Sequence, residues 1–180
     1  IKAGELALPN RSLLTAAAIG FLAGIGVTAV SVIPDPVISI ILTGNELQEP
    51  GKPLLYGQVY ESNSFGLTAA LESLHLPVHR IYKAEDDPEV LTAILQQALN
   101  ESDLVLLTGG VSVGDYDFVL QAAEKCQVIK QFHKIKQRPG KPLFFGTKGN
   151  KLVFGLPGNP SSVLTCFYEY VTEALSLQTK

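Results

Sequence analysis

Three short runs of strand-favouring residues, each followed by a segment of helical character, constrain the fold of this 180-residue chain most. The runs are VISIILTG (residues 37–44), VHRIYKA (78–84) and DLVLLTGG (103–110). They are short for helices, and the first and third are continuously apolar, as strands buried on both faces of a parallel sheet are. We therefore expect these three runs to be strands of one mostly parallel sheet.

Segments of helical character follow the runs at residues 64–75, 88–99 and 116–125. In the second segment, Asp87 is a good N-cap, Pro88 suits the first helical position, and apolar residues recur on one face. Ser62 or Asn63 can cap the first segment. Because strand and helix alternate three times, the sequence predicts right-handed crossovers and an α/β fold.

The last third of the chain has a different pattern. VIKQFHKIKQ (128–137) alternates polar and apolar residues as a strand does, and the turn Gly149-Asn150 divides residues 143–155 into a predicted hairpin. A proline-bounded turn, PGNP, then opens a long helix with apolar residues on one face. We expect these elements to complete the same domain.

Residues 12–34 carry no charge and are numerous enough to suggest a membrane span. Their internal pattern favours another interpretation. Residues 13–23 are an alanine-rich helical segment with Ser12 as a possible N-cap, residues 24–26 end it with two glycines, and residues 27–32 suit a short strand. We therefore expect no membrane span, and no signal peptide, because no basic stretch precedes the run.

Composition excludes some partners and bounds the domain organisation. A formal net charge of -3 provides no global field for nucleic acid or an anionic membrane. Cys126 and Cys166 lie far apart without metal-ligand spacing, which supports neither zinc nor a disulfide and points to the cytoplasm. Since the chain starts at Ile1 and lacks methionine, we expect a piece of a longer protein, with residues 1–11 as a lead segment from a preceding domain and 12–180 as the α/β domain.

Candidate site residues follow the carboxyl ends of the expected strands, where open parallel sheets bind ligands. Gly109 and Gly110 let backbone N–H groups approach an anion without an intervening Cβ, and Ser112 adds a hydroxyl group. This loop is therefore a candidate phosphate site. A plain strand-to-helix turn is the other interpretation.

Four acidic residues lie at the same strand ends: Glu46 after the first, Asp86 after the second, Asp115 and Asp117 after the third. Clustered carboxylates beside a phosphate are how proteins hold Mg²⁺, so Glu46, Asp115 and Asp117 are candidate metal ligands. Taken alone, each acid is better explained as a helix cap or a solvated loop charge.

Two further elements offer groups that bind anions. Lys134, Lys136 and Arg138 fall on one face of the predicted strand, and Lys141 follows a Pro-Gly turn; a solvated edge protected by lysine is the other interpretation. The PGNPSS turn offers helix N-terminal N–H groups, or serves as a capping turn alone. The histidines show no metal-ligand spacing and are interpreted as structural or surface residues; these are His75, His79 and His133.

Six motifs in this order carry a resemblance: TGNEL with a following PG, GQVYESN, DDP, TGGVSVGDYD, QRPGKPLFFG and GLPGNPSS. Together they closely resemble the molybdopterin-binding domain of molybdopterin molybdotransferases, the molybdenum insertases, a family that includes the E domain of gephyrin. The resemblance implies a three-layer α/β/α domain with a mostly parallel sheet. It also implies the last step of molybdenum cofactor synthesis, in which adenylylated molybdopterin receives molybdate, AMP is released and magnesium assists.

The resemblance assigns roles to residues that match the family motifs. Glu46, Asp86 and Asp117 match acids implicated in activity, the last two through the DDP and GDYD motifs. The matching substrate-binding positions are Thr108, Gly109, Gly110, Ser112, Arg138, Lys141, Pro157, Gly158, Asn159 and Ser162. Three positions depart from the family pattern: Asn45 and Glu61 stand where Asp is usual, and Arg138 replaces a frequent Lys.

The resemblance also implies partners and leaves other functions open. A homodimer of the full-length protein and molybdopterin adenylyltransferase as the pathway partner are expected, with neither nucleic acid nor a membrane. An adenylyltransferase sharing the fold is one alternative function, opposed by the QRPGKP and LPGNP motifs. A non-catalytic scaffold that binds a partner is another, opposed by the converging charges of Glu46, Asp117, Arg138 and Lys141.

Overall fold

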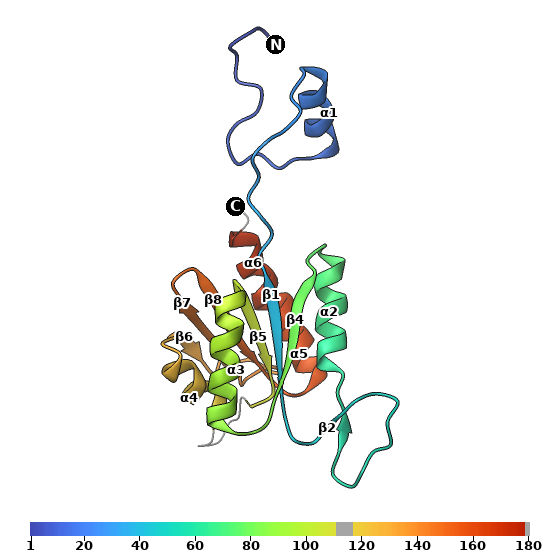
Figure 1. Ribbon diagram of the computed structural model, residues 1–180, viewed down its shortest axis with the longest axis vertical. Coiled ribbons are helices and arrows are strands. Elements are labelled where there is room, and N and C mark those ends of the chain that lie inside the picture. The colour runs from blue at the N-terminus through green and yellow to red at the C-terminus, as the bar shows by residue number, and fades with distance from the viewer. Residues whose placement is uncertain (111–116, 179–180) are drawn as a thin grey trace. The chain divides into compact units, whose positions relative to one another are not determined.

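A computed structural model describes residues 1–110 and 117–178 of the chain (Figure 1). The chain divides into two compact units, Ile1–Pro34 and Asp35–Gln178. The boundary expected at residues 11 and 12 stays a prediction. The second unit holds the expected sheet and all the candidate site residues that the structure describes.

The sheet of the second unit has the strand order β4-β1-β5-β8-β7-β6. The strands are β1 (Ile38–Thr43), β4 (Val78–Ala84), β5 (Leu104–Thr108), β6 (Ile129–His133), β7 (Phe144–Lys148) and β8 (Lys151–Leu156). The first four in spatial order are parallel, whereas β7 is antiparallel to both β8 and β6. The mostly parallel sheet and the hairpin around Gly149 are therefore confirmed.

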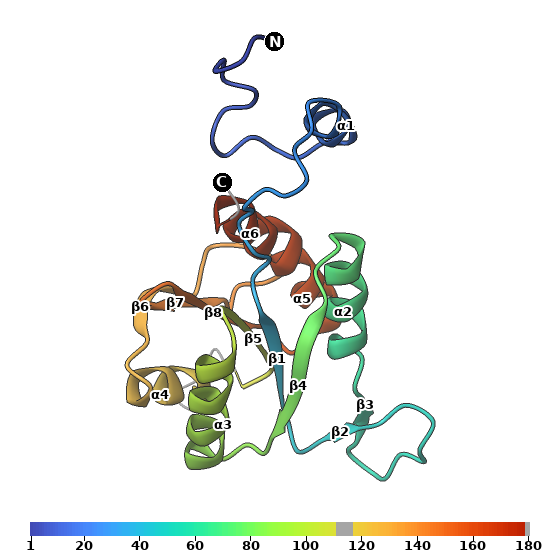
Figure 2. The ribbon, with the colours of Figure 1, turned by 45° about the horizontal axis from the view of Figure 1, so that its top comes forward.

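Helices cover both faces of this sheet and make three layers (Figures 1 and 2). One face carries α2 (Asn63–Ser73), α5 (Pro160–Cys166), the π-helical turn η1 (Phe167–Val171) and α6 (Thr172–Gln178); the other carries α3 (Pro88–Glu101) and α4 (Phe118–Lys125). The β1 strand is buried throughout, and its residues alternate between the layers. Ile40 packs with the α2 side and Ile41 with the α3 side, which explains its continuously apolar sequence.

A two-stranded parallel ribbon, which the sequence analysis did not predict, lies between β1 and α2. Its strands are β2 (Leu47–Gln48) and β3 (Val59–Tyr60). Each has only two residues, too few for period-two alternation to be visible in the sequence. The backbone loop between them projects from the domain in both ribbon views (Figures 1 and 2).

The capping predictions are partly confirmed. Asp87 caps α3, because its Oδ1 accepts hydrogen bonds from the N–H groups of Glu89 (2.8 Å) and Val90 (3.0 Å). At α2, Ser62 makes no side-chain capping bond. Ser62 occupies the predicted N-cap position, but the carboxylate of Glu61 instead accepts from the Ser64 N–H at 2.7 Å, so the predicted side-chain capping was wrong.

The first unit differs more from the expectations. Its helix α1 (Ala16–Gly24) begins later than predicted, and Thr15 rather than Ser12 caps it, accepting from the Ala18 N–H. Residues 27–32 form no strand. Their β-branched composition favours extended backbone, but strand formation also needs a neighbouring strand for hydrogen bonds. None of the described helices is long and apolar enough to cross a membrane.

The predicted basic strand face was also wrong. β6 ends at His133, and Lys134 has a left-handed φ of 62°, which breaks the alternation before Lys136 and Arg138. These residues lie in a loop where the Arg138–Pro139 peptide is cis. The alternation of polar and apolar residues over 128–137 therefore extends beyond the strand, because only residues 129–133 pair with β7.

We expect Asp87→Ala to lower the midpoint temperature of thermal unfolding at pH 7, because two N–H groups of α3 lose their acceptor. Asp87→Asn should stay near wild type, since Asn caps equally well. Hydrogen bonds from Val90 and Glu89 lower the pKa of Asp87 in the folded state. The stabilisation is therefore present above the unfolded pKa of about 4 and is lost as pH falls through the folded pKa.

Thermal unfolding between pH 2 and pH 7 tests this expectation. The matched control is Glu85→Ala, because Glu85 is an exposed acid two residues away that caps nothing. A difference between wild type and Asp87→Ala that stays constant over the whole pH range would contradict it.

Candidate functional site

The candidate site lies at the edge of the sheet where the parallel strands have their carboxyl ends. From β1 the chain passes to β4 on one side, and from β4 it returns to β5 on the other side of β1. The connections that leave β1 and β5 therefore diverge, with α2 and α4 on opposite faces. Such a switch point leaves a crevice in which open α/β sheets bind ligands.

The two glycines after β5 approach the end of β1 closely. Gly109 and Gly110 have φ of 80° and 63°, and a Cβ on Gly109 would lie 2.5 Å from the carbonyl oxygen of Thr43. The Thr43 hydroxyl donates to the Thr108 carbonyl at 3.2 Å. This contact places the glycine backbone beside the β1 end, as a phosphate-binding loop requires. Ser112, predicted for the same loop, lies outside the described residues.

Two loops at this edge are joined by reciprocal hydrogen bonds. The Asn45 N–H donates to Oδ2 of Asp86, and the Asp86 N–H donates to Oδ1 of Asn45, both at 3.3 Å. Both residues are exposed. The structure therefore brings the predicted acid Asp86 to the β1 loop, because β4 is the neighbour of β1 in the sheet.

Glu46 is exposed and folds back over Gly44. A Cβ on Gly44, whose φ is 134°, would lie 2.9 Å from Oε2 of Glu46. The positive φ favours glycine at position 44, and the absence of a Cβ leaves the exposed Glu46 side chain free to take this position. The predicted acid Glu46 therefore stands over the carboxyl edge of the sheet.

Asp117 is buried, whereas Glu46 and Asp86 are exposed. Its Oδ1 caps α4 by accepting from the Leu120 N–H at 3.1 Å, and its Oδ2 lies 2.9 Å from Nε2 of His133. Burial lowers the pKa of His133, and the negative charge of Asp117 opposes that shift. Sequence reasoning missed His133 because the β6 end reaches α4 only in the fold.

These contacts bear on the predicted magnesium site. Among the described residues, no three His, Cys, Asp or Glu side chains are grouped so that they could hold a metal ion. Both carboxylate oxygens of Asp117 already face protein groups. Asp115 lies outside the described residues, so the set Glu46, Asp115 and Asp117 is not tested as a whole. The described residues do not by themselves fit a magnesium ion.

The PGNP turn closes another side of the site. Oδ1 of Asn159 accepts from the N–H groups of Ser161 (3.0 Å) and Ser162 (3.3 Å), which begins α5. The side chain of Asn63, at the start of α2, donates to the Gly158 carbonyl at 2.9 Å. Pro157 and Ser162 are buried. The predicted turn is therefore a capping turn that also joins α2 to the β8 end.

The basic residues Arg138 and Lys141 are exposed on the loop that follows β6. Because β6 runs in the same direction as β8, this loop leaves the sheet at the same edge as the other candidate residues. Gly140 packs against Cys166 of α5, where a Cβ would lie 2.6 Å from Sγ. The loop is thus tied to the helix that the PGNP turn begins.

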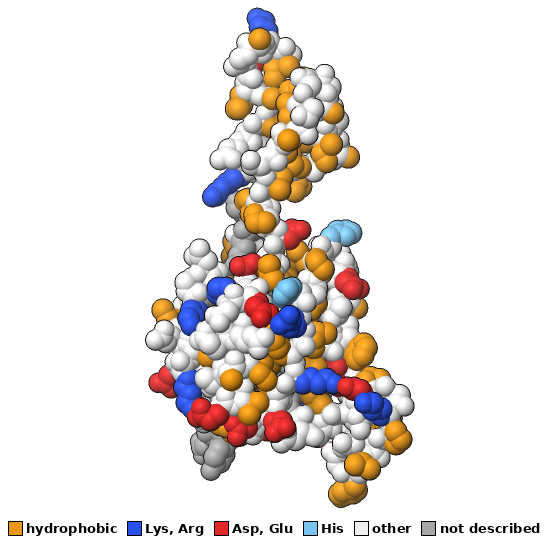
Figure 3. All heavy atoms as spheres, in the orientation of Figure 1, with side chains coloured by type: hydrophobic (Ala, Val, Ile, Leu, Met, Phe, Trp, Pro, Cys, Tyr) orange, Lys and Arg blue, Asp and Glu red, His pale blue; other side chains and the backbone are white. Residues whose placement is uncertain are grey.

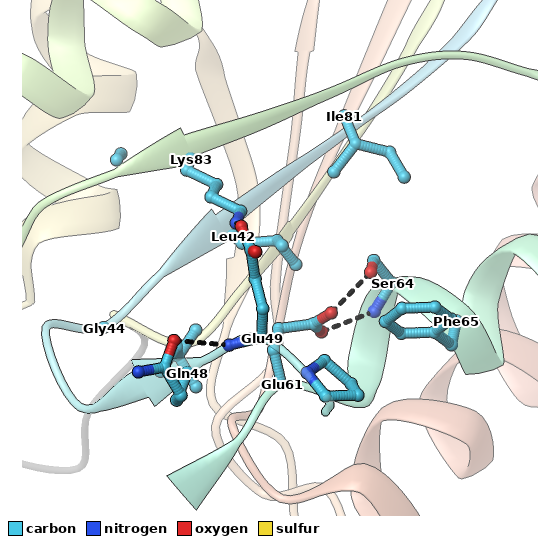
Figure 4. Close-up of a pocket in the computed structure, with 12 residues that line it drawn as sticks. Leu42, Gly44, Gln48, Glu49, Glu61, Ser64, Phe65, Ile81 and Lys83 are labelled. Atoms are coloured by element: carbon cyan, nitrogen blue, oxygen red, sulfur yellow. Dashed lines mark hydrogen bonds and ion pairs between the residues drawn. The ribbon is translucent and has the colours of Figure 1, made fainter. Parts of the chain in front are cut away.

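A cavity of about 410 Å³, which the sequence analysis did not predict, adjoins these loops on the α2 side of the sheet (Figure 4). It shares only Gly44 with the crevice residues described above, and its other lining residues come from β1, from β2 and the residues after it, from the start of α2 and the residue Glu61 that precedes it, and from β4. These are Leu42, Leu47, Gln48, Glu49, Pro50, Glu61, Ser64, Phe65, Ile81, Lys83 and Ala84. No pattern in the sequence indicated this cavity, because its lining residues come from segments that only the fold brings together.

Fold and edge loops together define an α/β ligand-binding domain with its candidate site at a switch point. The chain matches the family described as probable molybdopterin binding domain over residues 39–176, and it belongs to that family. It is 37% identical over 171 residues to the molybdopterin molybdenumtransferase of Haemophilus influenzae, covering 95% of this chain and 42% of the relative. It is 34% identical over 182 residues to molybdopterin molybdenumtransferase 2 of Mycobacterium tuberculosis, covering 98% and 45%.

Solved structures agree with this family. The molybdopterin biosynthesis MoeA protein from Pyrococcus horikoshii matches with a TM-score of 0.79 and 33% identity, over 98% of this chain and 44% of that chain. The molybdopterin biosynthesis enzyme MoaB from Thermus thermophilus matches with a TM-score of 0.57 and 20% identity, over 79% and 96%. That second likeness shows the fold alone. The chain spans less than half the length of the two molybdenumtransferases named above.

We expect Gly109→Ala to lower the free energy of unfolding by more than about 2 kcal/mol, because a positive φ costs about 1 kcal/mol and overpacking adds to it. Gly149→Ala is the matched control: its φ is 58°, and no described atom lies within 4 Å of the added Cβ. It should cost only about 1 kcal/mol. Urea unfolding measures both, and equal losses would show that Thr43 does not constrain the loop.

Proposed function

We propose that this chain is the molybdopterin-binding domain of a longer molybdopterin molybdotransferase. In this role it binds adenylylated molybdopterin at the carboxyl edge of its sheet and supports insertion of molybdate with release of AMP. The observation that carries the proposal is that five segments far apart in the sequence meet at one edge of the sheet. Three contacts at this edge involve these segments: Thr43 with Gly109, Asn45 with Asp86, and Asn63 with Gly158.

The relatives support the insertase over the adenylyltransferase. Those at 34% and 37% identity are named molybdopterin molybdenumtransferases, whereas the MoaB likeness at 20% concerns the fold. The chain also keeps exposed Arg138 and Lys141 on a loop tied to α5. Adenylyltransferase activity is therefore the second candidate function, and the similarity of fold to MoaB is its only support.

The described residues would act by binding and electrostatics. Backbone N–H groups at Gly109 and Gly110 suit the phosphate, and the N-terminus of α5 faces the same edge. Arg138 and Lys141 supply positive charge for molybdate, an oxyanion that this acidic chain must attract locally. None of these steps requires a protein nucleophile, and Cys166, whose thiol pKa burial raises to about 11, is unsuited to be one.

Further expectations belong to the full-length protein. A homodimer, the molybdopterin adenylyltransferase as pathway partner, and a cytoplasmic location stay predictions. Magnesium also stays a prediction, because its expected ligand set includes Asp115. If it binds, it would supply positive charge between the phosphates and molybdate.

Calorimetric titration of this chain with adenylylated molybdopterin, under anaerobic conditions and with or without Mg²⁺, tests the proposed function. We expect saturable binding that Glu46→Gln weakens about tenfold or more, the usual scale for losing one charged contact. Glu72→Gln, an exposed acid near the end of α2, is the control. Absence of binding to the folded wild-type chain would overturn the proposal, and equal binding of both variants would remove Glu46 from the site.

A further inference from the structure

The basic loop after β6, residues 134–143, is held differently at its base and at its tip. At the base, the N–H group of Ile135 donates to the carbonyl of Lys141 at 3.0 Å. No hydrogen bond between backbone groups of the described residues holds the tip, residues 136–140. A fixed conformation of the tip therefore depends on side chains.

Gln137 supplies the side chain that fixes the tip. Its Nε2 donates to the carbonyl of Pro139 at 2.8 Å, and its Oε1 accepts from the hydroxyl group of Tyr170 at 2.5 Å. Chemistry sets the direction of these bonds, because a proline carbonyl can only accept and so requires the NH₂ group of the amide. The amide of Gln137 therefore links the turn η1 to the tip of the basic loop.

The hydroxyl group of Tyr170 is held in place by the packing of its ring. The side chain is partly buried, and its ring lies edge-on to Phe132 of β6, with the ring centroids 6.4 Å apart. Phe132 in turn packs against Phe145 of β7 at 5.5 Å. All three rings pack against the core on the α2 side of the sheet. The hydroxyl group is therefore presented to the loop from a rigid element.

A second contact from the same helical segment reaches the tip. Gly140 is buried, and a Cβ there would lie 2.6 Å from Sγ of Cys166 and 2.9 Å from Nε2 of Gln137. Cys166 and Tyr170 are four residues apart, about one helical turn, so they present the same side of the helix to the loop. Cys166 thus packs against Gly140 while Tyr170 holds Gln137.

Arg138 lies between the two residues that the amide of Gln137 joins. Because its neighbours Gln137 and Pro139 are linked by this hydrogen bond, its backbone is fixed while its side chain is exposed. None of the ion pairs between described residues involves Arg138 or Lys141. Lys141 is held separately at the base, where its carbonyl accepts two backbone hydrogen bonds at 3.0 Å. The two cations of the loop are therefore fixed by different contacts.

We propose that Tyr170 and Gln137 are positioning residues for Arg138, which hold its backbone in place so that the guanidinium group can meet an oxyanion. The proposal rests on the proposed function, in which Arg138 and Lys141 supply positive charge for molybdate. A cation on a fixed backbone loses less conformational entropy on binding than one on a mobile loop, so the bridge raises the affinity for the anion. Tyr170 and Gln137 themselves do not contact the anion in this arrangement.

A double-mutant cycle on molybdate binding tests the proposal, with equilibrium dialysis of the chain against molybdate as the measurement. Tyr170→Phe keeps the ring but loses the hydroxyl group, and we expect it to weaken molybdate binding about fivefold, the scale of one hydrogen bond. In an Arg138→Gln background the same change should have almost no further effect. In a Lys141→Gln background the full loss should persist, because Lys141 is held by other contacts.

Controls separate positioning from a loss of folding. Tyr168→Phe, which removes the hydroxyl group of an exposed tyrosine in the same turn, should bind molybdate as wild type does. Gln137→Met, which removes both hydrogen bonds of the amide with little change of volume, should reproduce the loss seen in Tyr170→Phe. Circular dichroism should show the same secondary structure for all variants.

The outcomes distinguish this proposal from the proposed function. Equal binding by wild type and Tyr170→Phe, or an equal loss in the Arg138→Gln and Lys141→Gln backgrounds, would overturn the positioning role and leave the oxyanion role of the loop standing. If wild type binds no molybdate, or if Arg138→Gln binds it as tightly as wild type, the positioning role fails together with the oxyanion role of Arg138. Calorimetry with adenylylated molybdopterin then decides the proposed function, which fails only if the folded wild type does not bind that ligand.

Discussion

The parallel pairing of β1 with β5 is the constraint on which the rest of the site depends. Leu42 aligns with Thr108 across this pair, and the Thr43 hydroxyl bonds the end of β5. The next two residues must be glycines, because a side chain on either would meet Thr43. The neighbouring strands are placed by this pair, because β4 pairs with the other side of β1 and β8 pairs with the other side of β5.

Charge is distributed unevenly over this frame. Acidic groups lie around the ends of β1, β4 and α4, while the basic loop follows β6 at the other end of the strand order (Figure 3 shows both signs scattered over one face). Asp117 and His133 form a buried contact between α4 and β6.

Particular residues show how far sequence reasoning reached. The β1 and β5 strands, the N-cap at Asp87 and the β7–β8 hairpin were predictable, because each is specified by neighbouring residues. The ribbon, the end of β6 at His133 and the lack of a strand at 27–32 were not, because pairing depends on distant segments. Among the candidate site residues, Asp86 lies beside Asn45 because β4 pairs with β1, a contact that the sequence analysis did not predict, and Asp117 is buried at the start of α4.

The sequence by itself determined the alternation of strands and helices, the motifs of the molybdopterin-binding family and the residue types at each strand end. These depend on local spacing, which hydrophobic periodicity and turn chemistry record directly. Only the tertiary structure decided that Glu61 borders a cavity, that His133 meets Asp117, and that Lys83 faces the same cavity. The reason is physical: strand order and helix packing bring together residues whose separation along the chain carries no signal of their contact.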